Sequence, residues 1–140
     1  MPSKNTLRHL RRQAAQKQAW LCFYCHLPMW DAGPTEFLGQ YAISPGLAKR
    51  FQCTAEHLEA KCDGGKDVQI NIVAACIFCN ATRHKAKNPL NATKHAAVVR
   101  LRMAKGKWHP PQVMEALAKR KNAPSLSKTG FTIIQMREKS

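Results

Sequence analysis

The sequence predicts a small α+β protein in which a short strand–loop–strand–helix core lies between two basic helical segments. A chain of 140 residues is long enough for one domain, or for a small core with extensions, and too short for a large multidomain enzyme. Gly64-Gly65 is a turn signal between two segments that suit strands, residues 52–57 and 70–74. The chain is slightly acidic at its centre and strongly basic in the segments before and after it. This distribution indicates that the centre binds a cation and the flanking segments bind a polyanion.

Two helices are expected around the strands. Residues 4–20 carry Leu7, Leu10 and Ala14 at positions that fall on one side of a helix. A second helix is expected over residues 76–87, because Asn88-Pro89 ends it.

The C-terminal part of the chain predicts further helices. One is expected over residues 92–105 with Asn91 as its cap, and another over residues 112–121 after the break at Pro110-Pro111. Apolar residues in 130–136 suit a strand or a segment packed on the core.

The predicted organisation has three parts, with an inserted loop of little regular structure inside the second. These are a basic N-terminal helix (1–20), the core (21–88, with the inserted loop at 26–51) and a basic helical extension (89–140).

The charge distribution favours a polyanion as partner. Residues 1–20 carry a net charge of +5 and residues 83–140 carry +12, while residues 21–82 carry −2. Lysine and arginine that neutralise phosphates release counterions, so nucleic acid is the expected partner. A basic surface that maintains solubility or touches acidic lipids is the alternative.

Nothing in the sequence predicts a membrane span. The longest apolar run, residues 72–78, is seven residues, whereas a helix needs roughly 18 to 20 to cross a bilayer. The N-terminus shows no apolar stretch suited to a secretory signal. We therefore expect a cytoplasmic protein with no membrane contact.

Four of the six cysteines form two C-x-x-C pairs, Cys22 with Cys25 and Cys76 with Cys79. Two such pairs supply the four thiolates of a structural, tetrahedral Zn²⁺ site. In a cytosolic protein a metal site is favoured over disulfides, and a redox motif is the weaker alternative. Cys53 and Cys62 fit no such spacing, and we expect them to be small buried apolar residues.

The residues between and after these pairs form an ordered set. Glu56 and His57 precede the glycine pair, Asn71 follows it, and Asn80 and His84 follow the second C-x-x-C pair four positions apart. This order resembles the HNH endonuclease family, whose ββα-metal fold it implies for residues 20–87, about half of the chain.

The resemblance assigns a catalytic role to each of these residues. It makes His57 the general base that takes a proton from water, a task suited to a neutral imidazole. It makes Glu56, Asn80 and His84 the ligands of a catalytic divalent ion, either Mg²⁺ or another cation such as Mn²⁺ or Ni²⁺. It makes Asn71 the residue that ties down the loop between the strands and orients the base through hydrogen bonds. His84 has an alternative role as a contact to the DNA backbone.

The implied activity is hydrolysis of DNA phosphodiester bonds, by nicking or by double-strand cleavage, and the sequence contains no visible reader of base sequence. RNA as substrate is an open alternative, and so is a zinc-stabilised nucleic-acid-binding module without catalysis. The chain departs from the family pattern by Glu56 before the base, by Ala60 in place of a proline, and by its long inserted loop. The expected nucleic-acid contacts are Arg8, Arg11, Arg12, Arg83, Lys85, Lys87, Lys94, Arg100 and Arg102.

Overall fold

The centre of the molecule is a two-stranded antiparallel hairpin, seen in a computed structural model that describes residues 4–119. Strand β1 (Cys53–His57) pairs with strand β2 (Ile72–Cys76). The register places Cys53 opposite Cys76 and His57 opposite Ile72. The cysteine pair therefore lies at one end of the hairpin and His57 at the other.

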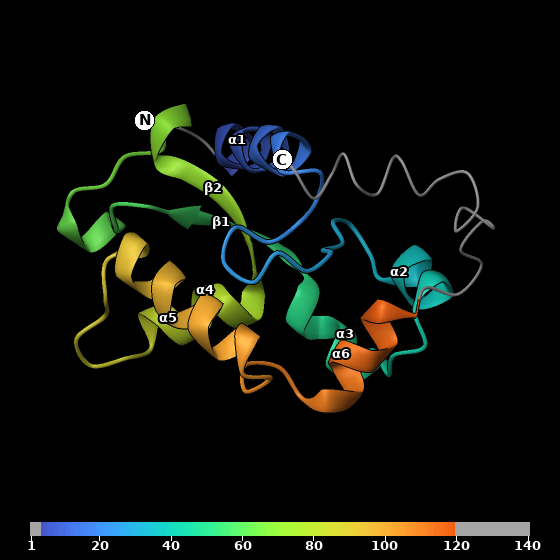
Figure 1. Ribbon diagram of the computed structural model, residues 1–140. Coiled ribbons are helices and arrows are strands. Elements are labelled where there is room, and N and C mark those ends of the chain that lie inside the picture. Colours follow the sequence, from blue (N-terminus) through green and yellow to red (C-terminus); the bar gives the residue numbers. More distant parts are fainter. Residues whose placement is uncertain (1–3, 120–140) are drawn as a thin grey trace.

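Helices cover both faces of this hairpin. Helix α1 (Lys4–Lys17) lies across one face, and helix α4 (Ile77–His84) packs against the two strands on the other side (Figure 1). The side chains of Ala74 and Ala75 in β2 are fully buried. Small side chains at these positions let both helices approach the sheet. The prediction of a small α+β fold with strand, loop, strand and helix in this order is confirmed.

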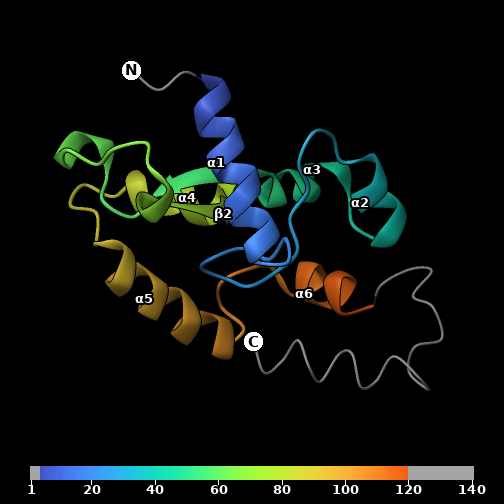
Figure 2. The ribbon, with the colours of Figure 1, turned by 90° about the horizontal axis from the view of Figure 1, so that it is seen from above.

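Two further helices follow on the same side of the hairpin as α4. Helix α5 (Ala92–Ala104) begins at Asn91, whose side chain accepts a hydrogen bond from the Lys94 N–H, as a cap does. Helix α6 (Pro111–Ala118) begins at the proline pair. In the view from above, α5 and α6 lie to one side of the strands (Figure 2). Both predicted helices are therefore present.

Residues of α5 and α6 belong to the same buried cluster as residues of the core. Val99 of α5 and Val113 of α6 are completely buried, and they lie in one hydrophobic cluster with Tyr24 and Phe51. These helices are thus packed onto the core through apolar contacts.

The inserted loop at 26–51 is not irregular, and that part of the prediction is wrong. It contains helix α2 (Thr35–Gln40), the one-turn helix α3 (Pro45–Ala48) and a 3₁₀ turn (Lys49–Phe51). Pro34 and Pro45 stand at helix starts, where a missing N–H costs nothing, rather than breaking the chain. Aromatic side chains then anchor the insertion in the core, where Phe37 stacks on Phe51 with ring centroids 5.9 Å apart.

The expected boundaries shift by a few residues elsewhere. Helix α1 ends at Lys17 rather than at residue 20, because Ala19 and Trp20 both adopt positive φ angles, of 55° and 61°. The segment 130–136 lies outside the described residues.

Within residues 4–119, no helix is both long enough and apolar enough to span a lipid bilayer.

One side chain, Gln18, joins α1 to the outer edge of β2. Its Nε2 donates to the carbonyls of Ala74 and Leu21, each at 2.8 Å, and its Oε1 accepts from the Ala74 N–H at 2.9 Å. The amide therefore pairs with Ala74 as a neighbouring strand would.

We expect Gln18→Ala to lower the free energy of unfolding by about 1–3 kcal/mol, because it leaves the buried Ala74 N–H without its partner. Urea unfolding followed by circular dichroism measures the change. Gln16→Ala, at an exposed position of α1, is the matched control and should change stability by less than about 0.5 kcal/mol. Equal effects of the two substitutions would show that the Gln18 contacts contribute nothing.

Candidate metal centre and the opposite end of the hairpin

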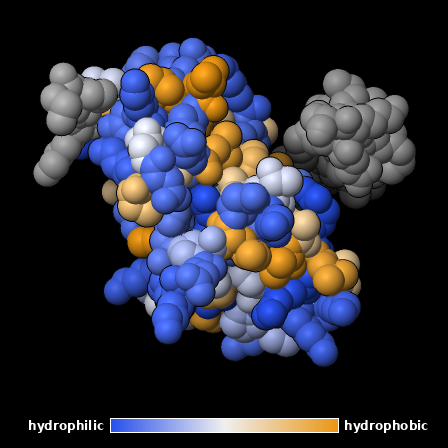
Figure 3. Space-filling model, turned by 90° about the vertical axis from the view of Figure 1, so that its left-hand side faces the viewer, coloured by the Kyte–Doolittle hydropathy of each residue, from blue (hydrophilic) through white to orange (hydrophobic). Residues whose placement is uncertain are grey.

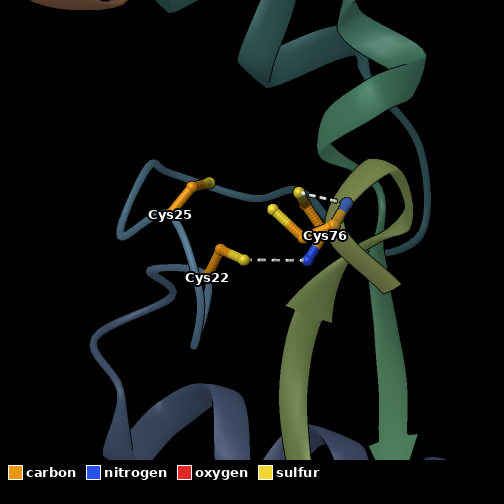
Figure 4. Close-up of side chains that lie close together, drawn as sticks. Cys22, Cys25 and Cys76 are labelled. Carbon is orange, nitrogen blue, oxygen red and sulfur yellow. Dashed lines mark hydrogen bonds between the residues drawn. The ribbon is translucent and has the colours of Figure 1, made fainter. Parts of the chain in front are cut away.

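The thiols of Cys22, Cys25, Cys76 and Cys79 converge on one point. All four side chains are buried, and their sulfur atoms lie within 4.8 Å of one another. Figure 4 shows the first pair, on the loop after α1, facing Cys76 at the end of β2. Tetrahedral Zn²⁺ with bonds of about 2.3 Å needs four sulfurs at this kind of spacing. The predicted four-cysteine cluster is confirmed, and it can hold a metal ion such as zinc.

Without a bound cation, the four clustered thiols cannot all ionise easily, because each thiolate charge repels the next. Burial raises the pKa of Cys22, but hydrogen bonds from the other three thiols outweigh this effect and lower it well below its ordinary value. The same contacts with Cys22 and Cys25 raise the pKa values of Cys76 and Cys79. One thiolate therefore opposes the ionisation of the next, and a divalent cation removes that opposition.

N–H groups also point at the sulfurs and offset thiolate charge. The Cys22 sulfur accepts from the backbone N–H groups of Tyr24 and Cys76, each at 3.3 Å. The indole N–H of Trp108 donates to the Cys79 sulfur at 3.2 Å. Such second contacts orient metal ligands. The sequence did not predict this contact of Trp108, because no spacing pattern links it to Cys79, 29 positions earlier.

The other two cysteines differ from each other. Cys53 is buried, as predicted, whereas Cys62 is exposed in the loop between the strands, so the prediction of a buried Cys62 is wrong. Cys62 lies in a short 3₁₀ turn (Lys61–Asp63) that has no buried residue.

Glu56 lies at the centre of a buried polar network. Its side chain is 1% exposed, and its Oε2 accepts from the Tyr24 hydroxyl at 2.7 Å and from Arg83 Nη1 at 2.9 Å. Its Oε1 lies 2.9 Å from His84 Nε2. Burial and the neighbouring Glu56 carboxylate raise the pKa of Tyr24, so its hydroxyl keeps its proton and donates.

Arg83 lies in the interior rather than on the surface predicted for a nucleic-acid contact. It is 5% exposed, and besides Glu56 it donates to the carbonyls of His57, Leu58 and Leu90. A buried carboxylate needs such a partner. We therefore assign Arg83 a structural role. Nothing in the sequence indicated this role, because Arg83 is followed by a histidine and by lysines that are typical of a surface.

Asn80 and His84 share one side of α4, but they have different partners. The Asn80 amide nitrogen donates to the Ala55 carbonyl and to Thr54 Oγ1, each at 3.1 Å. Within the described residues, no hydrogen bond joins Asn80 to Glu56 or His84. The structure thus pairs Glu56 with His84 and binds Asn80 to one side chain and one backbone carbonyl of β1.

The Asn71 side chain joins two stretches of the loop between the strands. Its Oδ1 accepts from the Glu59 N–H at 2.7 Å, and its Nδ2 donates to the carbonyls of Glu59 and Lys66 at 3.1 and 3.0 Å. A Cβ at Gly65 would lie 1.7 Å from the Glu59 carbonyl oxygen, so only glycine fits this fold of the loop.

His57 stands at the end of β1 beside this loop. Its Nε2 lies 2.7 Å from a carboxylate oxygen of Asp67, a residue that the sequence analysis did not single out. An aspartate two residues after Gly64-Gly65 reads as an ordinary turn residue, so the sequence offered no signal for this contact.

The remaining expected nucleic-acid contacts differ in exposure. Arg11 and Arg12 both form ion pairs with Asp31, at 2.7 and 3.0 Å, and the Arg11 side chain is largely buried. The others are exposed, on α1, on segment 85–91 and on α5: Arg8, Lys85, Lys87, Lys94, Arg100 and Arg102.

Comparison with known proteins adds nothing to this geometry: no family model matches the chain, and no match is found among curated proteins or solved structures. Function therefore has to be inferred from the residues and their arrangement.

We expect the purified protein to contain one zinc ion per chain and Cys22→Ser to lose it, because three thiolates and a hydroxyl hold zinc more weakly than four thiolates. Elemental analysis together with thermal unfolding measures both occupancy and stability. Cys62→Ser is the matched control and should retain zinc. Full zinc occupancy in Cys22→Ser would contradict the assignment of the cluster as a metal centre.

A second prediction concerns acid stability and rests on His109. This side chain is 3% exposed, and its Nδ1 lies 3.1–3.3 Å from guanidinium nitrogens of Arg50. Burial, assisted by the Arg50 charge, lowers the pKa of His109 to about 4, compared with about 6.5 in an unfolded chain. Between these values the unfolded chain binds a proton that the folded protein does not, so stability falls as the pH falls through this window.

His109→Asn keeps an acceptor for Arg50 but has no such proton to bind. We expect it to lose about 1 kcal/mol less stability than the wild type between pH 7.5 and pH 5.5. Urea unfolding at the two pH values checks this, with His9→Asn, at an exposed position of α1, as the control. Equal losses in wild type and His109→Asn would contradict the prediction.

Proposed function

We propose that the protein is a metal-dependent endonuclease of the HNH kind that hydrolyses phosphodiester bonds in DNA. One observation carries the proposal: Glu56, which pairs with His84, and His57 are consecutive residues at the end of β1 that is remote from the four cysteines. A general base and a pair of metal-binding side chains are the two components that this hydrolysis needs.

In this proposal, His57 activates the attacking water. The proton of the water moves to the imidazole, and the electron pair of the broken O–H bond forms the new bond from oxygen to phosphorus. The bond from phosphorus to the 3′ oxygen breaks, and the leaving oxygen keeps that electron pair until it takes a proton from solvent. The products carry a 5′ phosphate and a 3′ hydroxyl.

The donor set at Glu56 and His84 suits a divalent ion. Glu56 Oε1 and His84 Nε2 lie 2.9 Å apart, close to the separation of adjacent ligands on an octahedral ion with bonds of about 2.1 Å. Glu56 Oε2 stays with Tyr24 and Arg83, which hold the carboxylate in place. A bound ion such as Mg²⁺, Mn²⁺ or Ni²⁺ would supply Lewis-acid stabilisation of the phosphate charge and of the leaving oxygen. Asn80 would act from outside this pair, by holding the backbone of β1.

Basic residues surround the same end of the hairpin. The loop 58–71 and segment 85–91 both lie at the left of Figure 1, where β1 ends. Seen from that side, the surface is mostly hydrophilic, with hydrophobic residues gathered at the top and from the centre to the right (Figure 3). The exposed lysines of the two segments are Lys61, Lys66, Lys85 and Lys87. Exposed lysines on these two segments suit contacts to the phosphates of a duplex.

A zinc-stabilised nucleic-acid-binding module is the second candidate function. It is favoured by the complete set of protein partners around Glu56, since Tyr24, Arg83 and His84 satisfy the carboxylate without a metal ion. This candidate explains the cysteines and the basic surface, but it gives no task to His57.

The two candidates differ in the fate of supercoiled plasmid incubated with Mg²⁺, Mn²⁺ or Ni²⁺. We expect the zinc-loaded wild type to nick or cut it, and His57→Ala to be at least about 100-fold slower, because a general base contributes about 10²–10⁴-fold. His9→Ala controls for the loss of an exposed histidine. DNA binding without cleavage under every metal would exclude the nuclease and support the binding module.

A further inference from the structure

The imidazole of His57 is held by a carboxylate from the loop between the strands. His57 Nε2 lies 2.7 Å from Asp67 Oδ1, and the Asp67 side chain is 7% exposed. The second oxygen, Oδ2, lies 3.6 Å from the ammonium group of Lys61. The contact is therefore short, largely shielded from water and made by a residue ten positions away.

This contact decides which nitrogen of His57 carries the proton. An ionised carboxylate only accepts hydrogen bonds, and the hydrogen bond from His57 lowers the pKa of Asp67, with a further contribution from Lys61. Nε2 must therefore be the N–H group, which leaves a lone pair on Nδ1. Within the described residues, no hydrogen bond occupies Nδ1, so it can accept a proton from water.

Asp67 is itself held in place by the loop clamp. Asn71 Nδ2 donates to the carbonyl of Lys66, directly before Asp67, and Asn71 also binds both backbone groups of Glu59, two residues after His57. One side chain thus ties together the two stretches of chain that carry His57 and Asp67. The relative position of imidazole and carboxylate is fixed by this backbone clamp.

We propose that Asp67 is the positioning residue of His57: it keeps the proton on Nε2, aims Nδ1 at the attacking water, and stabilises the imidazolium that forms. The proposal rests on the proposed nuclease function. When the proton of the water moves to Nδ1, the ring becomes a cation, and the Asp67 carboxylate lies beside it with opposite charge. Asp67 remains ionised throughout, and no proton is transferred to it.

The test compares cleavage kinetics of the wild type, Asp67→Asn, His57→Ala and the double variant, all with zinc bound and with the same catalytic divalent ion. We expect Asp67→Asn to lower kcat by about 100-fold, within the range that a general base contributes, and to change KM for DNA by less than about twofold. Asp63→Asn, at an exposed position of the same loop, should leave kcat unchanged.

The double variant gives the readout that a merely structural role would not move. Because Asp67 acts through His57, Asp67→Asn should slow His57→Ala by no more than about twofold. Asp67→Glu, which keeps the carboxylate, should recover at least about tenfold of the kcat lost in Asp67→Asn. Thermal unfolding and zinc content establish that each variant is folded.

The outcomes separate the two proposals. A wild type that cleaves no DNA with any metal overturns the nuclease function and this inference with it. A wild type that cleaves, together with an unimpaired Asp67→Asn or with losses that multiply in the double variant, overturns the role of Asp67 and leaves the nuclease function standing.

Discussion

The convergence of four buried cysteines holds together parts of the chain that are far apart in sequence. About fifty residues separate Cys25 from Cys76, and the sheet between them has only two strands. A two-stranded hairpin is at best marginally stable alone. A metal ion bound by all four thiolates would close this long loop and fix the end of β2, from which α4 begins. The helix that carries His84 is thus positioned by the cluster at its first turn.

A buried ion pair at the opposite end of α4 completes this arrangement. Arg83 and Glu56 form a largely dehydrated pair, which usually contributes little net stability against an apolar alternative. The pair instead fixes the position of α4 relative to β1, because Arg83 also donates to the carbonyls of His57 and Leu58. The last turn of α4 is therefore fastened to the end of β1. Cysteines at one end and this pair at the other fix the helix on the strands.

The sequence predicted those features that depend on local spacing. The two C-x-x-C pairs, the glycine turn and the Asn91 cap each involve residues close in sequence, so they indicated the cluster, the hairpin and the start of α5. The predictions that were wrong concern features that depend on tertiary partners. These are the buried position of Arg83, the exposure of Cys62 and the helices of the insertion. Charge alone does not reveal that Arg83 faces a buried carboxylate, and a proline-rich stretch does not reveal that Phe37 will stack on Phe51.

The contact between His57 and Asp67 shows why the loop between the strands is built so tightly. An imidazole at the end of a strand can rotate, and a rotated ring presents the wrong nitrogen to a substrate. A carboxylate on a mobile loop would not prevent this, because ordering the loop would cost as much as the contact gains. The hydrogen bonds of Asn71 and the close packing at Gly65 already order the loop in the folded protein. The loop therefore holds Asp67 against His57 in the folded protein, and under the proposed nuclease function this contact would supply the preorganisation that a reacting group requires.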